Sequence, residues 1–129
     1  MIAPGIDIDW KGLPGYDEKA AERMPHAWKA GAQTMLLRRQ LEAMADGGVV
    51  VMTIPGNPYR CPPGPYERAC VIADYLKRNK PGAKMLVLDA NNGIQAEPEN
   101  FGNAFRTLYG DMLTYVPSAV LSGVYYDGN

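Results

Sequence analysis

The sequence predicts an α/β fold in which a βαβαβ half of a doubly wound sheet follows an irregular N-terminal segment and a helix. Two apolar runs, Val49–Ile54 and Met85–Asp89, have the composition of buried strands. Each run is followed by turn residues and then by a helix-spaced pattern. Short strands that alternate with helices are typical of a parallel sheet with right-handed crossover connections.

The residues before the first strand predict an irregular connection and then a helix. Residues 1–31 are rich in proline and glycine, which favour turns, and within them Asp17 can cap a short helix over about 17–23. A longer helix is expected over about 33–45, where apolar residues recur at helical spacing before a Gly-Gly pair. We therefore divide the chain into a connection, residues 1–31, and a domain, residues 32–129.

The elements of the domain follow from periodicity and from the residues that interrupt it. Val49–Ile54 is apolar on both alternations, which predicts a strand buried on both faces of the sheet. Proline suits the first turn of the helix that follows, and a Pro-Gly pair stops that helix. The expected order continues with a helix over about 65–79, a strand over 85–89, a helix over about 99–109, a strand over 113–116 and a fourth strand over about 119–126.

Composition excludes several classes of function. Thirteen basic residues stand against fourteen acidic ones, so charge gives no reason to expect nucleic-acid binding. No apolar run approaches the roughly 20 residues of a membrane-spanning helix, and the N-terminus has neither the basic nor the apolar region of an export signal. His26 is the only histidine beside two cysteines, so no zinc site is expected, and we predict no metal.

The turn after the first strand lacks the features that bind a dinucleotide. A phosphate-binding turn needs closely spaced glycines, whereas Gly56 and Gly64 are far apart here and four prolines remove amide donors. Asp89 ends the second strand, where a carboxylate could bind ribose, but without the glycines we interpret it as a strand-end residue or a cap. The sequence thus predicts a Rossmann-like half without the GxGxxG motif, and a genuine NAD-binding half is a weaker alternative.

A cysteine occupies the place of the phosphate turn. Prolines stiffen the loop around Cys61, and Arg60 and the dipole of the following helix can favour its thiolate. Glu67, in the first helical turn, could hold or move a proton at the same place. From chemistry alone, a small buried Cys61 and a purely structural helix-start Glu67 remain alternatives. Cys70, in mid-helix, is interpreted as structural.

Two blocks of sequence resemble the flavoprotein subunit of flavocytochrome c sulfide dehydrogenase. The first is Pro25–Gly31 (PHAWKAG) with the QTMLLRRQL segment that follows at 33–41, and the second is Arg60–Ala69 (RCPPGPYERA). The resemblance implies the second nucleotide-like domain of a flavoprotein with two dinucleotide-type domains. It also implies that residues 1–31 end the FAD-binding segment.

The resemblance assigns roles to particular residues. Ala3, Pro4 and Gly5 match the Ala-Pro-Gly that contacts FAD in the family. Cys61 matches a cysteine near the flavin that forms a redox disulfide with a second cysteine later in the chain, and Glu67 matches an active-site glutamate. The implied reaction oxidises sulfide and passes electrons through FAD to a c-type cytochrome subunit in the periplasm.

Departures from the family pattern limit what the chain is expected to do alone. The GxGxxG for the FAD pyrophosphate, the flavin-linking cysteine and the disulfide partner of Cys61 are absent. We expect a central fragment that is inactive alone and self-associates through an exposed face where a flavin domain would dock. One alternative is a sulfide:quinone oxidoreductase type, which residues 22–24 disfavour because they contain no cysteine. Another is a non-catalytic, degenerate Rossmann-like binding or assembly module.

Overall fold

The computed structural model describes residues 2, 5 and 7–126. The chain forms two compact units. The first comprises Met1–Ala43 with Leu121–Asn129, and the second comprises Met44–Val120. We describe each unit by itself.

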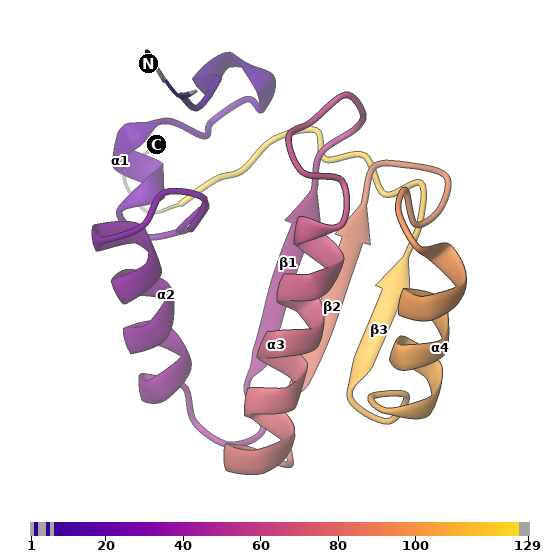
Figure 1. Ribbon diagram of the computed structural model, residues 1–129. Helices are drawn as coiled ribbons and strands as arrows, with labels where there is room; N and C mark the ends of the chain where they lie inside the picture. The colour runs from indigo at the N-terminus through magenta and orange to yellow at the C-terminus, as the bar shows by residue number, and fades with distance from the viewer. Residues whose placement is uncertain (1, 3–4, 6, 127–129) are drawn as a thin grey trace. The chain divides into compact units, whose positions relative to one another are not determined.

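The second unit is a parallel α/β structure. Its elements are β1 (Val49–Ile54), α3 (Gly64–Asn79), β2 (Lys84–Asp89), α4 (Pro98–Thr107) and β3 (Leu113–Val116). The strands lie in the order β1-β2-β3, and both neighbouring pairs are parallel (Figure 1). The predicted α/β class and strand–helix order are therefore confirmed, and β3 has the predicted bounds.

Helices α3 and α4 lie on the same face of the sheet (Figure 1). Register puts Ile54 beside Asp89, and it puts Val87 beside Tyr115 on the same face. That face is the core, since Ile54, Met85 and Val87 are at most 2% exposed. The helices contribute the buried side chains of Tyr66, Ala69, Ile72, Ala73, Leu76 and Phe105.

The opposite face of β1 is open to solvent. Val49 and Val51 are 59% and 57% exposed, although the alternate residue Ile54 is only 2% exposed. The prediction that this strand is buried on both faces is therefore wrong. The apolar residues on both alternations had indicated cover on both sides, but the described residues of this unit provide helices on one face only.

Helix α3 begins and ends as its sequence predicts. Pro63 is the N-cap residue and Pro65 lies in the first turn, where the absent amide hydrogen would have no helical acceptor. Lys77 and Arg78 lie in the last turn, near the negative end of the helix dipole. The helix places the loop that contains Cys61 directly before its N-terminus.

The first unit contains a 3₁₀ helix, Trp10–Gly12, and two α-helices, α1 (Glu18–Ala21) and α2 (Ala32–Ala43). The side chain of Asp17 caps α1, as predicted, by accepting a 2.7 Å hydrogen bond from the Ala20 amide. The apolar residues of α2 do not form a core, because the helix has no buried residue and Met35 is 48% exposed.

The fourth strand expected over 119–126 is not formed; this segment has no regular secondary structure. Instead, the Val124 amide donates to the Pro14 carbonyl at 2.9 Å. Gly15 has φ +79°, and a Cβ there would lie 2.1 Å from the Val124 carbonyl oxygen. Only glycine fits this close approach of the two chain segments.

Candidate functional site around Cys61

The loop between β1 and α3 holds Cys61 in a backbone conformation that is unusual for a side-chain-bearing residue. Its φ is +59°, in the left-handed region that costs an L-residue about 1–2 kcal/mol. The Cys61 carbonyl accepts a 2.9 Å hydrogen bond from the Gly64 amide, which closes the turn into α3. Such strain persists only where surrounding contacts impose it, and it is found preferentially at functional sites.

Cys61 is exposed and its thiol is free. The alternative that Cys61 is a small buried apolar group is therefore wrong. Glu67 is also exposed and lies in the first turn of α3, where a carboxylate is favoured by the helix dipole. The fold thus brings the thiol-bearing loop and this carboxylate to the same helix start. The catalytic roles of Cys61 and Glu67 stay predictions.

The second cysteine has a different environment. Cys70 is free and half-buried in α3, and burial raises the pKa of its thiol. A raised pKa keeps a thiol protonated, and the protonated form is the unreactive one. The structural interpretation of Cys70 agrees with this environment.

Asp89 has no free carboxylate oxygen for a ribose. Asp89 is completely buried. One carboxylate oxygen, Oδ2, accepts 2.8 Å hydrogen bonds from the hydroxyls of both Tyr66 and Tyr115. The other, Oδ1, accepts from the backbone and side-chain amides of Asn91, at 2.9 and 2.7 Å. Asp89 is therefore a buried structural acceptor at the end of its strand.

The two tyrosines are held as hydrogen-bond donors. Burial raises the pKa of Tyr66 and of Tyr115, and the neighbouring Asp89 acts in the same direction. A neutral phenol keeps the proton that it donates to the carboxylate. These hydrogen bonds offset the large free-energy cost of burying a carboxylate without partners.

Sequence reasoning missed the residues that connect this buried cluster to the Cys61 loop. Asn91 donates from its side-chain amide to the Pro55 carbonyl, and its side-chain oxygen accepts from the Asn57 amide, both at 2.9 Å. The Tyr59 hydroxyl lies 3.3 Å from the Pro62 carbonyl. The only local signal was a turn-forming Asn two residues after the end of β2, and it does not reveal the contacts with the loop.

The residues assigned to FAD by resemblance lie mostly outside the described part of the chain. Ala3 and Pro4 are not among the described residues. Gly5 is described, has φ +71°, and a Cβ there would meet no atom within 4 Å. The positive φ is a conformation that glycine adopts without strain, and the FAD contact of Gly5 stays a prediction.

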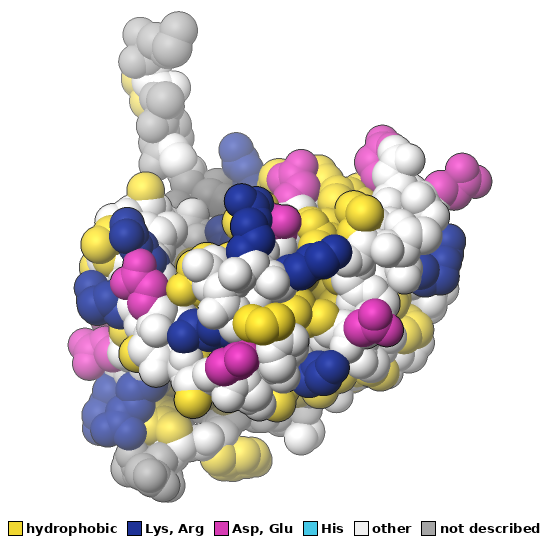
Figure 2. Space-filling view, turned by 90° about the horizontal axis from the view of Figure 1, so that it is seen from below, with side chains coloured by type: hydrophobic (Ala, Val, Ile, Leu, Met, Phe, Trp, Pro, Cys, Tyr) yellow, Lys and Arg dark blue, Asp and Glu magenta, His cyan; other side chains and the backbone are white. Residues whose placement is uncertain are grey.

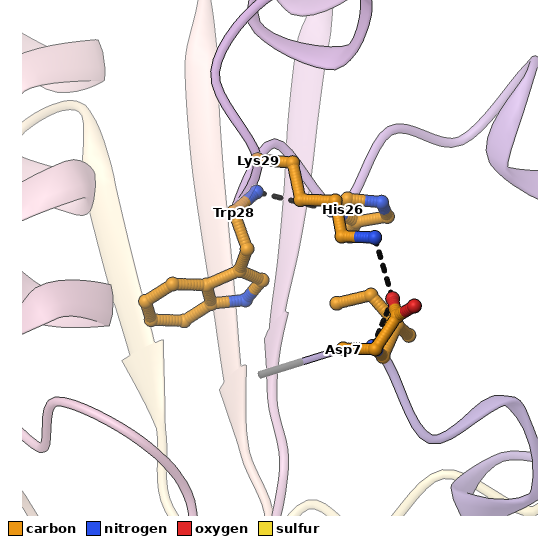
Figure 3. A network of polar contacts seen from close by, with 5 residues as sticks. Asp7, His26, Trp28 and Lys29 are labelled. Atoms are coloured by element: carbon orange, nitrogen blue, oxygen red, sulfur yellow. Dashed lines mark hydrogen bonds and ion pairs between the residues drawn. The ribbon is translucent and has the colours of Figure 1, made fainter. Parts of the chain in front are cut away.

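The histidine of the first unit is satisfied locally. His26 Nδ1 accepts a 3.0 Å hydrogen bond from the Trp28 amide, and the imidazole packs edge-on against the Trp10 ring. Figure 3 shows the hydrogen bond between Trp28 and His26 beside the ion pair between Lys29 and Asp7. We therefore interpret His26 as a structural histidine.

The described residues contain no candidate metal centre and no membrane-spanning helix. They contain no group of three or more His, Cys, Asp or Glu side chains that could hold a metal ion. No helix among residues 2, 5 and 7–126 is long and apolar enough to cross a membrane. The face drawn in Figure 2 carries Lys and Arg interspersed with Asp and Glu, in keeping with the net charge of -1.

The chain matches the model of a known protein family. The family model described as sulfide dehydrogenase (flavocytochrome c) flavoprotein chain, central, matches residues 34–127. The match covers well over half of the chain and includes Cys61, Glu67 and Asp89.

Proposed function

Because the chain belongs to the flavoprotein chains of flavocytochrome c sulfide dehydrogenase, we propose that it supplies the redox-active thiol Cys61 to a FAD-dependent oxidation of sulfide. The observation that carries the proposal is the exposed thiol at φ +59° in a proline-rich loop at the start of α3. Exposure allows a small anion to reach the sulfur.

In the proposed reaction Cys61 forms a disulfide with a second cysteine of the complete flavoprotein. Hydrosulfide attacks one sulfur of that disulfide, the S–S bond breaks, and a persulfide forms on one cysteine while the other leaves as a thiolate. Glu67 holds or moves the proton of the persulfide as it ionises. Bound FAD would supply the two-electron acceptor that passes electrons onward singly. Cys70 is unsuited to this exchange because burial raises its thiol pKa.

The cofactor and partners follow from the family. Ala3, Pro4 and Gly5 would contact FAD, although Gly5 alone of the three is described. The name flavocytochrome c implies a cytochrome c subunit as the partner in the complex, and we propose that this subunit accepts the electrons in the periplasm. The 129-residue chain by itself is expected to be colourless and inactive, and to self-associate.

The test is Cys61→Ser in a complete flavoprotein that carries this sequence. Flavin reduction by sulfide should be lost while bound flavin is retained. The matched control is Cys70→Ser, which replaces the half-buried thiol and should leave reduction intact. Normal flavin reduction in Cys61→Ser would exclude the thiol role.

A non-catalytic assembly module is a second candidate. Its support is the proline-rich turn and the fully occupied Asp89 carboxylate, which leave the second unit without a nucleotide site. Flavin absorbance separates the candidates: a complete protein that stays colourless after incubation with FAD would favour the module.

A further inference from the structure

We propose that Tyr59 and Asn91 are positioning residues for Cys61, which tie the loop over residues 55–63 to the buried carboxylate of Asp89. The inference deepens the proposed function, since it rests on Cys61 being the reactive thiol. It concerns residues that the motif around Cys61 does not contain.

Asn91 fixes the beginning of the loop. Its side-chain amide donates to Asp89 at 2.7 Å and to the Pro55 carbonyl at 2.9 Å. Its side-chain oxygen accepts the Asn57 amide at 2.9 Å. One side chain therefore satisfies both backbone groups at the loop entrance and connects them to the core.

Tyr59 fixes the middle of the loop. Its hydroxyl lies 3.3 Å from the Pro62 carbonyl and 3.5 Å from the hydroxyl of Tyr66, so its single proton can serve one acceptor at a time. Tyr66 in turn donates to Asp89 at 2.8 Å. The contact with Pro62 spans Cys61, because Tyr59 and Pro62 lie on either side of it.

These contacts explain why the strained conformation of Cys61 persists. A cysteine at φ +59° relaxes to negative φ unless its neighbours prevent it. Pro62 restricts the backbone on one side. Tyr59 restrains the other side through its contact with the Pro62 carbonyl. Asn91 anchors the beginning of the loop to the carboxylate of Asp89, which is completely buried. A strand-end carboxylate that could have bound ribose instead orients the thiol loop.

The test is Tyr59→Phe, which removes one hydroxyl and keeps the ring. The matched control is Tyr75→Phe, on α3 outside this network. In the full 129-residue chain, hydrogen exchange of the Gly64 amide reports the turn that encloses Cys61. We expect exchange to rise about three- to tenfold in Tyr59→Phe, the range that corresponds to one net hydrogen bond.

The same variants in a complete flavoprotein give a functional measure. The rate of flavin reduction at saturating sulfide should fall about three- to tenfold in Tyr59→Phe, with bound flavin unchanged. The positioning role would be overturned if Tyr59→Phe had the same Gly64 exchange rate, or the same rate of flavin reduction, as Tyr75→Phe. Asn91→Asp supplies a second test, because Tyr59→Phe alters only a hydroxyl. This variant keeps the acceptor for the Asn57 amide and loses the donor to Pro55 and Asp89, so it should also speed Gly64 exchange. Should Cys61→Ser leave flavin reduction intact while Gly64 exchange still rises in Tyr59→Phe, the thiol function fails and the loop anchoring stands.

Discussion

The hydroxyl of Tyr66 donates a 2.8 Å hydrogen bond to Asp89, and both side chains are completely buried. Tyr66 belongs to α3 and Asp89 to the end of β2, so the bond joins the helix that follows the Cys61 loop to the centre of the sheet. A carboxylate at this position is usually free to meet a ligand in dinucleotide-binding folds. Here it holds the core and the loop together.

Tyr66→Phe should lower the free energy of unfolding by about 1.5–3 kcal/mol, the range for a hydrogen bond to a charged group. The ring still fills its place, but Asp89 keeps only the Tyr115 hydroxyl at Oδ2. Urea unfolding of the 129-residue chain measures the change. Tyr75→Phe, in the same helix, is the control, and an equal loss in both variants would contradict the importance of the bond.

Alkaline pH should destabilise the chain through its buried phenols. Burial raises the pKa of Tyr16 to about 12 from 10, and its hydroxyl donates to the Met24 carbonyl at 2.7 Å. The folded state therefore holds this proton more tightly than the unfolded chain. The stabilisation is complete below pH 10 and is lost as pH rises from 10 toward about 12.

The free energy of unfolding, measured between pH 9 and 11, tests this direction of change. That range lies on both sides of the pKa of tyrosine in an unfolded chain, roughly 10. Tyr16→Phe should reduce the alkaline loss of stability. Tyr125→Phe is the control, because Tyr125 is 82% exposed. Stability that increases above pH 10 would show that the buried phenols do not govern this range.

Much of the fold could be predicted because its signals are local. The bounds of β3, the proline-led start of α3 and the Asp17 cap each depend on a few adjacent residues. The exposure of one face of β1 could not be predicted. Apolar residues that point to both faces of a strand indicate burial, but they do not show which element would pack on each face. Residues 119–126 had a strand-like composition, but Val124 pairs with Pro14 instead.

The candidate site could likewise be predicted only in part. Cys61 and Glu67 could be selected from the motif alone, since they lie within one short stretch of sequence. The network that holds the loop joins Tyr66 and Tyr115 to Asp89 across 23 and 26 residues. Such contacts depend on sheet register and helix packing, which no local pattern encodes.

Replacing each cysteine by glycine rather than alanine should change the free energy of unfolding in opposite directions at the two positions. At Cys61, with φ +59°, Cys61→Gly should be more stable than Cys61→Ala by about 1 kcal/mol, because glycine adopts this conformation without strain. At Cys70, inside α3, Cys70→Gly should be less stable than Cys70→Ala by about 1 kcal/mol. Urea unfolding of the four variants measures both differences. The same sign at both positions would mean that the Cys61 loop relaxes without strain.

Glu67→Gln should shift the pH profile of flavin reduction by sulfide in a complete flavoprotein, because the variant keeps the shape of the side chain and removes its titrating proton. Glu99→Gln is a matched control, since Glu99 is also an exposed carboxylate in the first turn of a helix, α4. Both variants lose a similar helix-dipole stabilisation of about 0.3–1 kcal/mol. A profile identical to that of Glu99→Gln would remove Glu67 from the proton path.

The open face of β1 should make the 129-residue chain self-associate. Val49 and Val51 are 59% and 57% exposed, and among the described residues β1 pairs with a strand on one edge only. An exposed apolar edge strand is a template for pairing with another chain. Val51→Lys should therefore raise the monomer fraction in sedimentation without lowering stability, because a charge on an edge strand opposes pairing. Val71→Lys places the same charge at a valine that is 68% exposed on α3, and it should leave association unchanged. Equal effects of the two lysines would indicate that net charge, rather than the face of β1, controls association.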